Sequence, residues 1–224
     1  MNKPYEFSNT GELVGCLRQN KAPIAEFFDK EIEGGVEEVI RSSVEGNTFR
    51  AFRRMPCKPS VVFRNWASER LSDNKVIESF TNIGSEQQYD LWLKQFSEDL
   101  CHYWTNEMGR GMPYGPGRKL PNLLLKRLVK WNRLKKLGGE GQRRRLIELL
   151  HVPLDKYTLA SIRRCIFNFP DIVDAVGTIP KNVTMSFVDT EDRYIRIQEM
   201  MREISRQAGV PAIYLDVLTW DLNH

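Results

Sequence analysis

The sequence predicts an all-α protein, a bundle of two helical lobes. Apolar residues recur at three- and four-residue spacing from Ser85 to Met108 and again from Thr190 to about Gln207, which is typical of amphipathic helices. The short run Val61–Trp66 leans towards a β-strand, so we expect at most a minor strand pair. No internal repeat or low-complexity segment divides the 224 residues, and we interpret residues 1–224 as a single helical domain.

The composition excludes several classes of protein. Hydrophobic residues make up 41% of the chain and charged residues 28%, which is ordinary for a globular protein and argues against disorder. No run approaches the roughly 18 apolar residues of a membrane span. The polar N-terminus lacks an apolar signal core, so we expect a cytoplasmic protein, associated with the nucleoid in a bacterium. The four cysteines are scattered without a C-x-x-C pair, which argues against a zinc site or a disulfide framework.

Positive charge is concentrated between Arg110 and Arg145. Twelve basic residues and a single acid, Glu140, give this window a charge of +11; the whole chain has a formal net charge of +4, so the rest carries −7. A basic block on an otherwise acidic protein is typical of a surface that binds a polyanion. The alternative is a solvated loop, and the glycine-rich turn beside the block favours nucleic acid.

The N-terminal half of the chain offers few functional signals. A helical region is expected to end at Gly46–Asn47, and the basic, proline-bearing segment Arg50–Pro59 reads as a surface loop. In the helix predicted from Ser85 to Met108, an aromatic stripe includes Trp92 and Phe96. Such a stripe is more often part of a core than a platform for nucleotide bases.

The turn Gly109–Gly117 contains four glycines and two prolines. Glycine lets a phosphate approach the backbone closely, and the start of a following helix favours an anion. Because Pro121 fits best in a first helical turn, we predict that the next helix begins between Arg118 and Leu120. Its buried face would contain leucines and Trp131, with Lys126, Arg127 and Lys130 directed away from it.

A second helix start lies further along the chain. Val152-Pro153-Leu154-Asp155 reads as an extended stretch, and Asp155 is a good N-cap for a helix that begins at Lys156. A later helix is predicted to begin near Thr190, with Tyr194, Ile197, Met201 and Ile204 facing inward.

These two helix starts resemble the active-site elements of a known family. Gly115-Pro116-Gly117-Arg118-Lys119 followed by Val152-Pro153-Leu154-Asp155 is similar to the G-x-G-x-K hairpin and the V-P-x-D element of the helix-hairpin-helix DNA glycosylase superfamily, most of all its 8-oxoguanine glycosylase/lyase branches. The similarity covers about 45 of 224 residues within the segment 109–167. The 36-residue spacing between Lys119 and Asp155 is long, and the usual L-P-G of the hairpin survives only roughly.

The resemblance implies a base-flipping DNA glycosylase that acts on double-stranded DNA with a modified base. It makes Lys119 the nucleophile at C1′ and Asp155 the group that assists it. The resulting Schiff base would permit β-elimination, as in the bifunctional members, and the choice between a monofunctional enzyme and a glycosylase/lyase stays open. Catalysis would need Lys119 as the neutral amine, and hence a lowered lysine pKa. No cofactor is expected, although a monovalent cation can bind at such a hairpin. The expected DNA contacts are Gly115, Gly117, Arg118, Lys126, Arg127, Lys130, Arg143 and Arg144.

In the resembled family the C-terminal helix lines the base pocket, which makes Tyr214, Asp216 and Trp220 candidates for base recognition. The base itself is not determined by the resemblance, and roles in DNA repair and in defence against phage DNA are both open. We expect a monomer that does not bind membranes.

Other interpretations stay open at this stage. Lys119 can serve only as a phosphate contact, and Asp155 only as a helix cap. The main alternative function is a non-catalytic helical nucleic-acid-binding protein that uses the hairpin as a phosphate grip. A helical RNA-binding or nuclease-type defence protein is a third option, although no compact carboxylate cluster adjoins the basic block to hold a catalytic metal.

Overall fold

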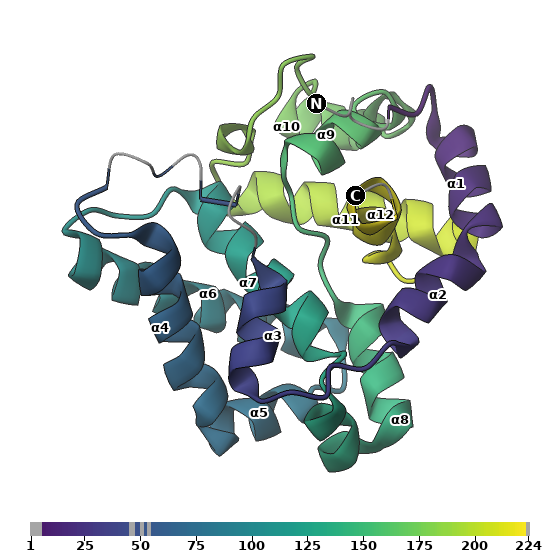
Figure 1. Cartoon of the computed structure of the whole chain (residues 1–224). Helices are drawn as coiled ribbons and strands as arrows, with labels where there is room; N and C mark the ends of the chain where they lie inside the picture. Colours follow the sequence, from purple (N-terminus) through teal and green to yellow (C-terminus); the bar gives the residue numbers. More distant parts are fainter. Residues whose placement is uncertain (1–5, 45–47, 50–51, 53–54, 223–224) are drawn as a thin grey trace. The chain divides into compact units, whose positions relative to one another are not determined.

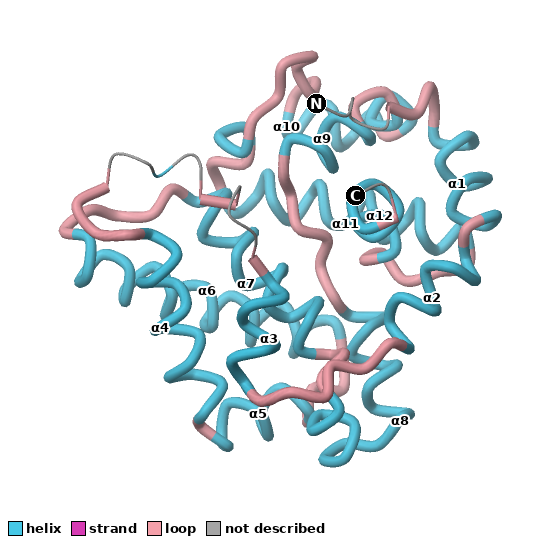
Figure 2. Tube along the Cα trace, in the orientation of Figure 1, coloured by secondary structure: helices cyan, strands magenta, loops and turns pink. Residues whose placement is uncertain are grey.

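The computed structural model describes residues 6–44, 48–49, 52 and 55–222, and this part of the chain is helical (Figures 1 and 2). It contains twelve α-helices and no strand. The one β-like feature among these residues is an isolated bridge between Ile32 and Trp131. The predicted all-α class is therefore confirmed. The helix end expected at Gly46–Asn47, and much of the basic segment Arg50–Pro59, lie outside the described residues.

The chain, which the sequence suggests is a single domain, forms two compact units. The first contains Met1–Asp29, Pro113–Lys119 and Leu150–His224, and the second contains Lys30–Met112 and Leu120–Leu149. Helix α7 (Tyr114–Leu128) contributes its first residues to the first unit and its remainder to the second. Both Lys119 and Asp155 belong to the first unit.

Helix α11 (Glu191–Ala208) is the central element of the first unit, and Figure 1 shows it in yellow-green beside α10. Its predicted inward residues, Tyr194, Ile197, Met201 and Ile204, are all buried. Thr190 caps its start, and Gly209 ends it in the left-handed conformation at φ 68°. Helices α1 and α10 pack against α11. The other helical elements of this unit are α1 (Thr10–Gln19), α2 (Lys21–Asp29), α9 (Lys156–Ile162), α10 (Pro170–Val176), α12 (Tyr214–Asp216), a π-helical turn at Val217–Asp221 and 3-10 turns at Cys165–Asn168 and Met185–Phe187.

The second unit is organised around α6 (Glu86–Met108), which lies within the helical range predicted from Ser85 to Met108 and is capped by Ser85. Phe96 and Leu100 of the aromatic stripe are buried. Trp92 is half-buried and stacks on Phe96 with ring centroids 4.7 Å apart. The stripe is thus part of the core. The remaining helices of this unit are α3 (Val36–Ser43), α4 (Pro59–Ser72), α5 (Asn74–Thr81) and α8 (Asn132–Leu149).

The β-leaning reading of Val61–Trp66 is wrong, because this run lies within α4. Pro59 stands at the helix start, where its missing N–H costs nothing. Val62, Phe63 and Trp66 are all buried, at a spacing that suits one helical face. Burial of that face outweighs the weak strand preference of β-branched residues. Helix α10 was not expected either, because Pro170 reads in the sequence as a stop signal and in fact begins a new helix.

Candidate active site

Helix α7 begins earlier than the sequence predicts. It starts at Tyr114 rather than between Arg118 and Leu120, so Gly115 and Gly117 lie in its first turns. Pro121 is inside the helix, and because proline has no amide hydrogen, the carbonyl of Gly117 loses its usual helical partner. Packing of the flanking residues outweighs that loss, since Pro116, Gly117 and Leu120 are all buried.

The early helix start corrects the predicted role of the two glycines. The Gly117 amide donates to the carbonyl of Pro113 at 3.1 Å, so it is already committed within the helix. Gly115 is buried, and a Cβ placed on it would lie 2.4 Å from the carbonyl oxygen of Met185 and 3.0 Å from that of Val188. Gly115 is therefore needed for close packing between two backbone segments. Neither residue presents the open phosphate grip that the sequence suggests.

Lys119 and Asp155 lie side by side in the first unit. Lys119 Nζ is 3.2 Å from Asp155 Oδ2, and the two side chains are only 12% and 16% exposed. The residues are 36 positions apart in the sequence and come from the first turns of α7 and from the cap of α9. Their proximity is thus a product of the tertiary fold. It places a carboxylate oxygen within hydrogen-bond reach of a partly buried amine.

Asp155 also caps α9, as predicted. Its Oδ1 accepts hydrogen bonds from the amides of Tyr157 at 2.8 Å and Thr158 at 3.0 Å. The backbone is extended at Asp155, with φ −123° and ψ −177°, which suits an N-cap residue. One carboxylate oxygen therefore fixes the helix start, while the other faces Lys119. The capping role and the contact with the amine are compatible.

Asp155 gives a prediction about stability. Asp155→Ala removes the cap and should lower the free energy of unfolding by about 1 kcal/mol more than Asp155→Asn, which caps nearly as well. The contrast separates the cap from the ion pair, because both variants lose the charge that faces Lys119. Urea unfolding followed by circular dichroism measures the difference. Equal destabilisation by the two substitutions would contradict the capping role.

Arg118 is committed within the protein, which corrects its predicted role as a DNA contact. Its side chain is 8% exposed, and its Nε donates to the Tyr114 hydroxyl at 3.0 Å. The guanidinium lies over the rings of Tyr114 and Tyr194, at 5.2 and 5.6 Å from their centroids, and 3.8 Å from a carboxylate oxygen of Glu191. These contacts join the start of α7 to the start of α11.

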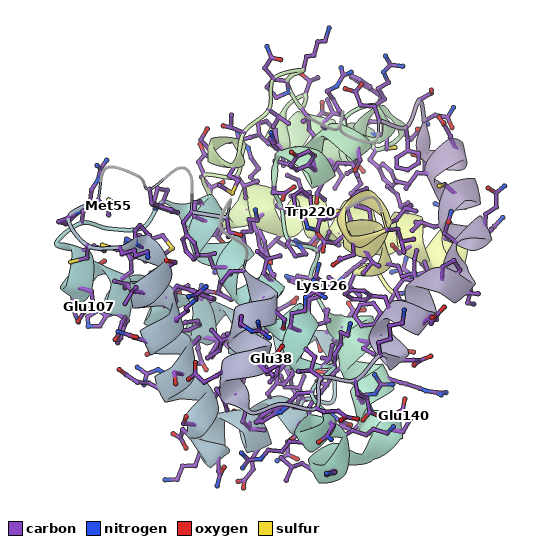
Figure 3. All side chains as sticks on the ribbon, viewed as in Figure 1. Glu38, Met55, Glu107, Lys126, Glu140 and Trp220 are labelled. Carbon is purple, nitrogen blue, oxygen red and sulfur yellow. The ribbon has the colours of Figure 1, made fainter. Side chains whose placement is uncertain are left out.

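The predicted outward positions of Lys126 and Lys130 are wrong. Lys126 is 1% and Lys130 7% exposed, although Leu120, Leu124, Leu128 and Trp131 are buried as expected. Each lysine interacts with other groups of the protein, as a buried cation must. Lys126 can be located in Figure 3. A phosphate could reach these lysines only after a rearrangement.

The remaining cations of the basic block differ in exposure. Arg143 is 4% exposed and pairs with Glu140 at 2.7 Å, so it is also not an open contact. Arg127 is half-buried, and Arg144 is exposed as expected. Hydrogen bonding from Arg143, together with Arg144 and Lys135, lowers the pKa of Glu140 to about 2. Glu140, which is labelled in Figure 3, therefore stays charged and offsets part of the positive charge of the neighbouring Arg143, Arg144 and Lys135.

The three candidates for base recognition also differ in how exposed their side chains are. Tyr214 is 8% exposed and stacks on Phe28 with centroids 5.7 Å apart, and Asp216 is 3% exposed. Trp220 is half-buried, and its ring centroid lies 5.0 Å from that of Tyr157, two residues after Asp155. Trp220 therefore lies beside the helix that Asp155 caps. Its partner Tyr157 was not identified from the sequence.

Three side chains of α11 hold the extended stretch that precedes Asp155. The sequence did not single them out for a functional role. Tyr194, Gln198 and Arg202 lie at four-residue intervals along α11 and contact His151 or Val152. The detectable signal was the spacing of these three polar groups on a helix face otherwise predicted to be apolar.

Comparison of the chain with protein-family models, curated proteins and solved structures finds no match.

Proposed function

We propose that this protein is a DNA N-glycosylase in which Lys119 attacks the sugar and Asp155 assists. The observation that carries the proposal is the 3.2 Å approach of Lys119 Nζ to Asp155 Oδ2 in a site where both side chains are mostly buried. A nucleophilic amine needs an acceptor for its proton and an environment with little water. The pair supplies the acceptor, and its burial limits the access of water.

The proposed reaction uses the two functional groups in sequence. Lys119 transfers a proton to Asp155 Oδ2, and its nitrogen lone pair then forms a bond to C1′ as the C1′–N bond to the base breaks. The base leaves with the electron pair of that bond and takes the proton that Asp155 Oδ2 accepted from Lys119. A proton then moves from the lysine nitrogen to O4′ as the sugar ring opens, which gives a protonated imine between C1′ and Lys119. Loss of a C2′ proton and departure of the 3′ phosphate by β-elimination cleave the strand. After giving its proton to the base, Asp155 is again a carboxylate and stabilises the positive charge of the protonated imine.

The proposed substrate is a modified base flipped out of double-stranded DNA. Tyr157 and Trp220 form a half-buried aromatic pair, and Lys156 Nζ lies 4.6 Å from the centroid of the Tyr157 ring. Aromatic faces of this kind suit stacking with a nucleobase. Tyr214 and Asp216 are the weaker candidates, because their side chains are already buried.

We assign DNA backbone binding to the exposed cations of α8 in place of the buried ones. Arg133, Lys136, Arg144 and Arg145 are exposed on this helix, which bends at Gly139, where φ is 74°. Lysine and arginine side chains on one helix can neutralise several phosphates and release their counterions.

This assignment predicts a change in salt dependence. The double variant Lys136→Gln, Arg144→Gln should bind duplex DNA more weakly and reduce the slope of log Kd against log salt by about 1 to 2. Fluorescence anisotropy at several salt concentrations measures the slope. The matched control is Arg64→Gln, Lys75→Gln, which removes two exposed cations from α4 and α5 of the same unit. Equal slopes for the two double variants would contradict a specific α8 surface.

The enzymatic proposal is tested by base release from duplex oligonucleotides. The panel contains 8-oxoguanine, uracil and glucosylated hydroxymethylcytosine, which cover damage repair and the modified DNA of phages. Release of at least one base by the wild-type protein is expected. DNA binding without release from any duplex would favour the alternative function, a non-catalytic nucleic-acid-binding protein, which the exposed cations of α8 also support.

A further inference from the structure

We infer that Gln198 is a positioning residue that holds the stretch before Asp155 and so sets the distance between Asp155 and Lys119. The consequence for catalysis rests on the proposed function, whereas the consequence for the geometry of the pair does not. All the residues involved belong to the first unit.

Gln198 forms hydrogen bonds with both polar backbone groups of Val152. Its Oε1 accepts from the Val152 amide at 3.0 Å, and its Nε2 donates to the Val152 carbonyl at 2.8 Å. Since the backbone amide can only donate and the carbonyl can only accept, these two bonds fix the orientation of the side-chain amide. Gln198 is 1% exposed. Val152 precedes Pro153 in an extended stretch that has no helix or sheet of its own to satisfy these groups.

The neighbouring His151 is held by the same face of α11. Arg202 lies 2.7 Å from His151 Nε2, and the Tyr194 hydroxyl lies 2.8 Å from His151 Nδ1. Because arginine only donates hydrogen bonds, Nε2 is the acceptor, and the ring hydrogen is on Nδ1, donated to Tyr194. Tyr194, Gln198 and Arg202 are spaced one helical turn apart. The helix thus presents a row of side chains that fixes two consecutive residues of the stretch.

Asp155 is held downstream by α9 and upstream, through Val152, by this row. The Asp155 cap bonds fix it to Tyr157 and Thr158, and the Thr158 hydroxyl donates to the carbonyl of Pro153 at 3.0 Å. These local bonds keep Asp155 on α9 and do not connect it to α11. The bonds to Val152 connect the stretch to α11, whose residue Tyr194 also contacts Arg118, next to Lys119. Gln198 therefore acts through Val152 on the geometry of the pair.

The test substitutes Gln198→Met, which keeps the length of the side chain and removes both hydrogen bonds. Lys119 is labelled with an amine-reactive acylating reagent in the absence of DNA, and its rate is compared by mass spectrometry with that of exposed Lys181. Loosening of the contact between Lys119 and Asp155 should raise the relative labelling rate of Lys119 about two- to fivefold, as loss of such an ion pair allows. In single-turnover assays the rate of base release should fall about tenfold or more at unchanged Kd.

The matched control is Gln207→Met, on the same helix but exposed, where the side chain donates to Glu203. It should change neither rate. If Gln198→Met lowers the melting temperature too far, Gln198→Glu replaces it. While its carboxyl is ionised, that variant keeps an acceptor for the Val152 amide and has no donor for the Val152 carbonyl, so an intermediate labelling rate is expected.

The outcomes distinguish this inference from the proposed function. Unchanged labelling of Lys119 in a folded variant overturns the positioning role, whatever the activity. Increased labelling together with no base release by the wild-type protein supports the positioning role and counts against the glycosylase. A rise in Kd with an unchanged rate on bound DNA would show that Gln198 affects binding alone, and it would also overturn the inference.

Discussion

Lys119→Gln is expected to reduce the single-turnover rate of base release by about a thousandfold or more, with little change in Kd for duplex DNA. Glutamine keeps most of the side-chain volume at the start of α7 but has no nucleophilic amine. A covalent mechanism loses its first step without that amine. Because the side chain is only 12% exposed and faces Asp155, its loss should affect chemistry more than contact with the DNA backbone.

Two controls make this result specific. Lys181→Gln removes an exposed lysine of the same unit, and it should retain the rate to within a few fold. Lys119→Arg keeps the positive charge and should remain inactive, because a guanidinium stays protonated. Activity of the arginine variant near that of the wild type would show that the charge at this position is sufficient, and it would contradict a nucleophilic role.

Gly115→Ala is expected to destabilise the first unit by about 3 kcal/mol, the upper part of the usual range for overpacking. The added Cβ would lie 2.4 Å from the backbone carbonyl oxygen of Met185. Backbone atoms cannot move aside as the end of a flexible side chain can. The residues around Met185 or the start of α7 must therefore shift, which would also move Lys119. Chemical denaturation monitored by circular dichroism measures the loss.

Gly111→Ala is the matched control, because a Cβ at this position meets no atom within 4 Å and the residue is exposed. We expect its free energy of unfolding to stay within about 0.5 kcal/mol of the wild-type value. If Gly115→Ala is equally stable, the close approach of Gly115 to the Met185 carbonyl is not present in the folded protein.

The features that the sequence predicted correctly depend on local signals. The start of α9 at Asp155 follows from a capping side chain after an extended V-P stretch, and the structure contains both cap bonds. The inward face of α11 follows from helical periodicity alone. The expectation that Lys119 and Asp155 face each other came from a family resemblance. Local patterns do not contain that information, since the two residues are 36 positions apart.

The features that the sequence missed depend on tertiary packing. Gly115 reads as a flexible turn residue. In the structure it lacks a side chain because its backbone packs closely against Met185, which is 70 residues away. Lys126 and Lys130 read as solvent-facing cations because lysine is rarely buried. Their burial is set by what covers α7 in the folded protein, and helical periodicity cannot reveal it. Gln198 was not singled out, because its role depends on hydrogen bonds to Val152, which is 46 residues away in the sequence.

The central claim is that Lys119 forms a covalent bond to the sugar, and borohydride trapping tests it most directly. The protein is mixed with a duplex that contains an abasic site and with duplexes that contain modified bases, and the imine is reduced to a stable amine. The account predicts a covalent protein–DNA adduct for the wild-type protein and none for Lys119→Gln, with the crosslink mapped to Lys119 by mass spectrometry. Absence of an adduct on the abasic duplex, or an adduct that persists in Lys119→Gln, would contradict it.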